Sequence, residues 1–204
     1  MNMTAATFFH EVEELLFSAL VASVSDAVNE FSGESIYALI LYPAGGFTSF
    51  GLAISSRERI NASPATQGID SGLLSLLEKH PDLLAKSREH EVSPNYFLMT
   101  ACEWDYFAEK QFAQLNNYLR TNYDSLYDLG QTPEKIEESF AELLISVIQR
   151  AKFDNCFLYP NVEPEPFLGF QYADTGNRPL MLHVSKNVNS SAWHDLAIAE
   201  WNGS

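Results

Sequence analysis

The sequence has little cysteine, with only Cys102 and Cys156 among its 204 residues. These two residues lie far apart and in no metal-binding or redox spacing. Glu11, Glu13 and Glu14 interrupt the first apolar run, which argues against a secretory signal peptide. No uninterrupted window of about 18 apolar residues is present to span a membrane. We therefore expect a cytoplasmic protein with reduced thiols and no membrane partner.

Basic residues are also scarce, since 12 Lys and Arg face 27 Asp and Glu, for a net charge of −15. This balance argues against nucleic acid as a partner, because proteins bind the phosphate backbone mainly through Lys and Arg. Residues 1–56 contain six acids and no Lys or Arg, and residues 101–149 contain nine acids against three basic residues. Such segments are either solvated helix faces or a field that steers a cationic partner, and we expect a basic protein partner.

Repeats and low-complexity linkers are absent, and 46% of the residues are hydrophobic. This is ordinary globular composition, and the length suits one domain. We therefore predict a single globular domain over residues 1–204, with a C-terminus that frays from about residue 190.

The clearest structural signal is a β-hairpin over residues 36–55. Two apolar runs flank Pro43-Ala-Gly-Gly46, whose glycines supply positive φ in the turn. Apolar periodicity predicts long helices over residues 7–31, 100–123 and 132–151, and shorter ones over 70–79 and 177–186. Further strands are predicted over residues 96–99, 156–162 and 167–172. The expected class is α/β in the α+β sense, with a mainly antiparallel central sheet flanked by several long helices.

The segment Gly46-Phe-Thr-Ser-Phe-Gly51 is the nearest approach to a catalytic motif, and it fails as one. Ser49 has one residue too many before it for a nucleophile elbow, which also requires a strand-to-helix turn. A phosphate-binding loop requires Lys and then Ser or Thr after the last glycine, where Leu52 and Ala53 stand. We predict no catalytic residue and no cofactor.

Cys102 falls in the first turn of the predicted helix that starts at Thr100, where a helix dipole lowers a thiol pKa. The competing interpretation is a small buried apolar residue. None of the five histidines has a metal-ligand spacing, so we predict no metal site. A pocket built from Cys102, Glu103 and a distant histidine such as His183 is the basis of an alternative function as an enzyme or small-molecule-binding protein.

Glu103, Trp104, Asp105 and Glu109 are the candidate partner-binding residues, crowded at the start of the same predicted helix. Thr100 and Glu103 fit a capping box, and acids near a helix N-terminus are favoured by its dipole, so capping is the competing explanation. Trp is enriched at interface hot spots, but Trp104 is at core spacing with Ala108.

The order of these motifs resembles a bacterial family called domain of unknown function 4303. The resemblance lies in the Tyr37–Tyr42 strand, the hairpin, the Thr100-Ala-Cys-Glu-Trp104 segment, the Asn116-Asn117 helix and Phe157-Leu-Tyr159. The sequence departs from the family at Leu98-Met99, where we expect Arg-Trp. The resemblance implies a protein of the immunity type, which neutralises a toxin by direct binding.

Taken together, these patterns predict an acidic cytoplasmic protein that binds a basic partner, and the resemblance implies that this partner is a toxin. The alternative is a small-molecule-binding protein or enzyme with a pocket near Thr100. A structural adaptor with a flat apolar patch is a third option.

Overall fold

The computed structural model describes residues 4–62, 95–172 and 177–203. A four-stranded sheet contains β1 (Ile36–Pro43), β2 (Phe50–Ser56), β3 (Tyr106–Ala108) and β4 (Val162–Phe170), in the order β3-β2-β1-β4. The predicted α+β class is confirmed, and the chain forms a single compact domain. The hairpin is confirmed as β1 and β2, which pair antiparallel from Ile36 opposite Ser56 to Pro43 opposite Phe50.

The sheet is mixed, which corrects the mainly antiparallel expectation. β2 pairs antiparallel with both β1 and β3, whereas β4 pairs parallel with β1. A parallel pair needs a long crossover connection, and the helix α8 (Pro133–Phe153) in the connection to β4 supplies it. Strand direction depends on where the connection returns the chain, and residue patterns do not report that.

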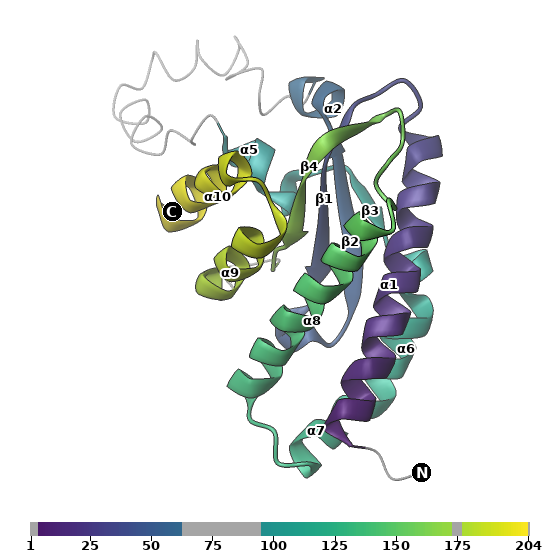
Figure 1. Cartoon of the computed structure of the whole chain (residues 1–204), viewed down its shortest axis with the longest axis vertical. Coiled ribbons are helices and arrows are strands. Elements are labelled where there is room, and N and C mark those ends of the chain that lie inside the picture. The colour runs from purple at the N-terminus through teal and green to yellow at the C-terminus, as the bar shows by residue number, and fades with distance from the viewer. Residues whose placement is uncertain (1–3, 63–94, 173–176, 204) are drawn as a thin grey trace, which may run out of the picture.

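Two long helices lie side by side along the sheet, α1 (Ala5–Glu30) and α8 (Figure 1). Both begin at a threonine cap: the Thr4 hydroxyl accepts a hydrogen bond from the Thr7 amide, and the Thr132 hydroxyl accepts one from the Lys135 amide. The α8 prediction is confirmed, including the proline at the first helical position. α1 starts earlier than expected, because Thr4 and not Thr7 is the cap.

Shorter helices complete the fold, and α9 and α10 gather beyond β4 in Figure 1. The expected fraying from about residue 190 is replaced by α10, which buries Trp193, Ala197 and Trp201. The predicted helix from residue 177 is confirmed as α9, capped by Asn177. The bounds are α2 (Arg57–Ala62), α5 (Tyr96–Met99), α6 (Ala113–Asn122), α7 (Ser125–Asp128), α9 (Arg178–Val188) and α10 (Ser191–Gly203), with 3₁₀ turns η1 (Gly45–Phe47), η2 (Ala101–Glu103) and η3 (Lys110–Phe112).

The hairpin turn is fixed by an aromatic side chain as well as by glycine. Gly46 has φ +69°, as expected, but the second residue with positive φ is Phe47, at +63°, and not Gly45. This conformation is unusual for a bulky residue. The Phe47 ring is fully buried and stacks on Phe140 of α8, with ring centroids 4.7 Å apart. Burial of the aromatic ring offsets the backbone strain.

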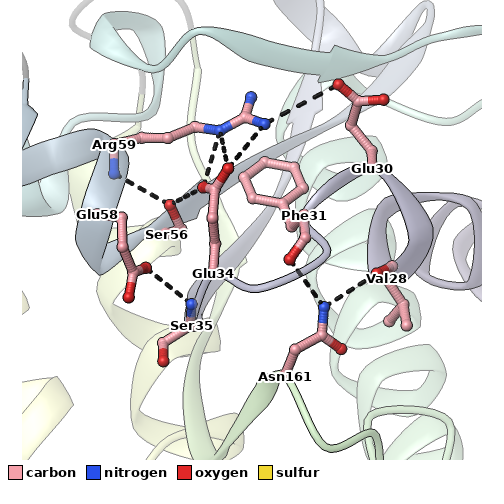
Figure 2. A network of polar contacts seen from close by, with 9 residues as sticks. All are labelled: Val28, Glu30, Phe31, Glu34, Ser35, Ser56, Glu58, Arg59 and Asn161. Atoms are coloured by element: carbon pink, nitrogen blue, oxygen red, sulfur yellow. Dashed lines mark hydrogen bonds and ion pairs between the residues drawn. The ribbon is translucent and has the colours of Figure 1, made fainter.

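The junction between α1 and β1 is held by polar side chains (Figure 2). The Asn161 amide donates to the carbonyls of Val28 and Phe31, which lie at the end of α1 and have no helical partner. The Glu34 carboxylate accepts hydrogen bonds from Arg59 and from the Ser56 hydroxyl. Burial alone would raise the pKa of Glu34, but these hydrogen bonds hold the pKa below its usual value. They fix the entry angle of the central strand.

The predicted strand over residues 96–99 is wrong, because these residues form the one-turn helix α5. A single turn leaves its last carbonyls without helical partners. Side chains from elsewhere satisfy them: Trp104 donates to Phe97 O, Tyr37 donates to Leu98 O, and both Gln171 and Trp201 donate to Met99 O. These long-range contacts outweigh the β propensity of the segment.

The predicted helix over residues 100–123 is correct only in its second half. Thr100 makes no capping hydrogen bond, and after the turn η2 the chain becomes extended at Trp104, with ψ 149°. Residues 106–108 then form β3 at the edge of the sheet, and a regular helix resumes only at Ala113. Burial of the Trp104 side chain competes with the local capping signal and prevails.

The predicted strand over residues 156–162 is also wrong, because this segment is a turn that follows α8, and β4 starts where that prediction ends. Asn155 has φ +59°, which ends the helix, and Leu158 is 78% exposed. The predicted strand over 167–172 falls largely within β4. The predicted helix over 70–79 lies outside the described residues.

Candidate partner-binding surface

β3 places an aromatic residue on the outside of the sheet edge. Successive side chains of a strand point to opposite faces. Tyr106 turns toward α1, where its ring meets Phe31 at 5.2 Å, and it is half-buried. Phe107 turns the other way, contacts the Tyr42 ring at 5.5 Å and is 39% exposed. Phe107 is therefore one of the few large apolar side chains presented to solvent in the described part of the chain.

Three of the predicted partner-binding residues surround this ring in the sequence. Glu103, Asp105 and Glu109 are all exposed, as a binding role requires. Glu103 accepts a hydrogen bond from the Tyr96 hydroxyl at 3.3 Å. We call Glu103, Asp105, Phe107 and Glu109 the β3 surface.

The carboxylates of the β3 surface have no ion-pair partner among the described residues. Some other acids of the protein are paired within the chain. Glu14 contacts Arg150 at 2.7 Å, and Glu163 contacts Arg57 at 2.7 Å. A carboxylate that is paired with a cation attracts a basic partner less strongly than an unpaired carboxylate, because the cation offsets its negative potential. The β3 surface is thus an acidic region whose charge no cation of the described residues offsets.

The end of α1 adds negative charge beside β3. Burial raises the pKa of the Tyr106 hydroxyl, and the nearby carboxylates of Glu30 and Asp26 raise it further. Both carboxylates are exposed, although Glu30 lies 3.9 Å from Arg59. These two carboxylates act on Tyr106, whose side chain points to the face of the sheet opposite to that of Phe107.

Trp104 is not part of this surface. It is only 4% exposed, its ring lies edge-on to Tyr37 at 6.1 Å, and its indole donates to Phe97 O at 2.8 Å. This contradicts its assignment as a partner contact and supports the core interpretation. A Trp with both its ring and its N–H engaged inside the protein is not available as an anchor for a partner.

Cys102 does not have the properties of an activated nucleophile. Partial burial and the charge of Glu103 raise the pKa of its thiol, and no hydrogen bond joins it to a histidine in the described part of the chain. The His183 ring bonds instead to Glu142 of α8, at 2.8 Å. The structure thus does not bring together the Cys102, Glu103 and His183 of the enzyme alternative.

A hydroxyl–imidazole pair, Ser185 and His194, has a structural role. His194 Nδ1 lies 3.3 Å from Ser185 Oγ. The serine is completely buried, and its hydroxyl also accepts a hydrogen bond from Asn189. A substrate could not reach it. His80 and His90 lie outside the described residues.

Over residues 4–62, 95–172 and 177–203, no group of three or more His, Cys, Asp or Glu side chains is placed to hold a metal ion. Within the same ranges, no helix is both long enough and apolar enough to cross a membrane.

The sequence analysis missed Phe107 and Tyr42. Both line a cavity of about 320 Å³ that also contains Glu109. If residues 105–109 are read as a strand, Phe107 falls on the same face as the charged residues Asp105 and Glu109, which favours an outward-facing position. The capping box at Thr100 predicted a helix over the same residues, so the strand position of Phe107 was not predicted.

Comparison with protein-family models, with curated proteins and with solved structures finds no match to this chain. The resemblance to domain of unknown function 4303 therefore stays a prediction.

Proposed function

We propose that this protein binds a basic protein partner through the β3 surface. The observation that carries the proposal is the exposed Phe107 ring with Asp105 and Glu109 on either side, neither of which has an ion-pair partner in the described ranges. The net charge of −15 favours the same class of partner.

The physical roles of the ring and the carboxylates differ. Aromatic side chains at the centre of an interface contribute much of its affinity when they are desolvated. Charges around them raise the association rate and select partners of opposite sign. The β3 surface has both components within a few residues, an aromatic ring with polar side chains around it, which corresponds to the apolar centre and polar rim of a protein interface.

We further propose that the partner is a toxin and that binding neutralises it. This part rests on the resemblance to the immunity-type family. It predicts that the partner is encoded beside this protein, because a toxin and its inhibitor must be produced together.

The test is co-expression with each neighbouring gene product in turn, with growth and co-purification as readouts. The expected result is one basic neighbour that stops growth alone, is tolerated with this protein and co-purifies with it. The double variant Asp105→Asn/Glu109→Gln should lose this protection. Glu134→Gln/Glu138→Gln, which removes the same charge from exposed positions on α8, should retain it. If no neighbour binds, or if both double variants behave alike, the proposal fails.

A further inference from the structure

The cavity beside Phe107 is lined by aromatic rings on one side, by a glycine at its floor and by one carboxylate. It measures about 320 Å³ and lies between the hairpin and the residues around β3. Tyr42 and Phe107 provide rings, and Glu109 provides the carboxylate. This volume is at the low end of ligand pockets, which span about 300–1,000 Å³, and it suits one side chain of a partner.

Gly51 keeps the floor of this cavity low. A methyl group at Gly51 would lie 3.4 Å from the Ala108 carbonyl oxygen and 3.6 Å from Glu109 Cγ. The Glu109 side chain thus extends across the glycine. A larger residue at this position would push against the one charged group that lines the cavity.

The amide side chain of the wall, Asn116, is already engaged. The Asn116 amide oxygen accepts from Phe50 N at 2.7 Å, and its nitrogen donates to Phe50 O at 2.9 Å. Asn116 therefore has a fixed orientation and is committed to the backbone. Glu109 has no such partner, and its charge faces no cation in the described ranges. Lys110 follows it in sequence but forms no ion pair with it.

We propose that this cavity receives an arginine side chain of the basic partner, an inference that rests on the proposed function. A guanidinium is planar, stacks on aromatic rings and donates two parallel hydrogen bonds to a carboxylate. The Phe107 ring supplies the stacking surface and Glu109 supplies the carboxylate. A lysine ammonium is more strongly hydrated and cannot form the paired hydrogen bonds, so arginine is the preferred occupant.

The test titrates N-acetyl-arginine amide, N-acetyl-lysine amide and N-acetyl-citrulline amide into the isotope-labelled protein, followed by amide chemical shifts. The arginine amide should shift Gly51, Phe107 and Glu109 and bind about two- to fivefold tighter than the lysine amide. The citrulline amide, which has arginine's shape without its charge, should not bind.

Matched variants make the result specific to the cavity. Glu109→Gln should weaken arginine amide binding about threefold, the scale of an exposed ion pair. Glu138→Gln, an equal charge change on α8, should leave it unchanged. Equal binding of arginine and lysine amides, or equal effects of the two variants, would overturn the inference. If a basic neighbour binds but arginine amide does not reach the cavity, the inference fails and the proposed function stands; if neither binds, both fail.

Discussion

The two edges of the sheet differ in how they are covered. At one edge β4 has nine residues, and side chains from the C-terminal helices cover its backbone. The Asn189 amide exchanges two hydrogen bonds with Leu168, and the Trp193 indole donates to Glu165 O. At the other edge β3 has three residues and presents Phe107 to solvent. Edge strands attract other chains, so a covered edge protects the fold and an exposed one is open to contact.

At each edge of the sheet one asparagine side chain forms two hydrogen bonds with the backbone of a strand residue. Asn116 bonds to both backbone groups of Phe50, just as Asn189 bonds to both groups of Leu168. In each case a side-chain amide stands in for a neighbouring strand. Coverage of the β2 edge therefore stops at Phe50, and from Leu52 to Ile54 the short strand β3 takes over.

The largest effect should come from opening the β4 edge. Trp193 is 9% exposed and packs on both Tyr37 and Phe167. Trp193→Ala should reduce the free energy of unfolding by about 3–5 kcal/mol, the usual range for removing a large core aromatic. Urea denaturation followed by circular dichroism measures it. A loss below about 1 kcal/mol would mean that α10 does not stabilise this edge.

The two asparagines should rank next. Asn189→Ala leaves the Leu168 amide and carbonyl without partners and also loses a contact to Ser185, so we expect a loss of about 2–3 kcal/mol. Asn116→Ala breaks two hydrogen bonds at a position that lines the open cavity, so water replaces them and the loss should be about 1 kcal/mol. The same urea titration compares them. Equal losses would show that the two edges are covered equally.

The α1–β1 junction should respond to pH in a way that neither edge does. The folded state holds the pKa of Glu34 below its unfolded value, so the ionised carboxylate contributes stability above that unfolded value of 4.5. This contribution should disappear as the pH falls through the folded pKa. Unfolding free energies of the wild type and Glu34→Gln should therefore differ at pH 7 and converge in acid. A difference that grows in acid would contradict the assignment.

The smallest effect on stability should come from the β3 edge. Phe107→Ser removes a partly exposed ring and its contact with Tyr42, so the free energy of unfolding should fall by no more than about 1 kcal/mol. Binding to the basic neighbour should nevertheless be lost. Thermal melting and co-purification of the same variant separate the two properties, and a large loss of stability would place Phe107 in the core instead.

Sequence patterns predicted the parts of this fold that local chemistry determines. Thr132 and Pro133 start α8 by capping and ring geometry, and the glycines at 45 and 46 locate the hairpin turn. The errors occur where a distant side chain decides the local structure. The capping box at Thr100 is a sound local signal, but Trp104 is drawn into the core against Tyr37, and the chain leaves the helical path there.

The candidate site was predictable to a similar degree. Glu103, Asp105 and Glu109 are exposed as expected, because charged residues at high density seldom lie in a core. Which acids lack a cation could not be predicted, since Glu14 and Arg150 meet only through the packing of α1 on α8. The role of Phe107 required knowing that it lies on a strand.

The most direct measurement is hydrogen exchange of the protein alone and in complex with the basic neighbour. The account predicts that binding slows exchange over residues 103–109, while α8 and β4 exchange at unchanged rates. Slowed exchange in the groove of about 670 Å³ lined by Leu158 and Pro164, with residues 103–109 unaffected, would contradict it.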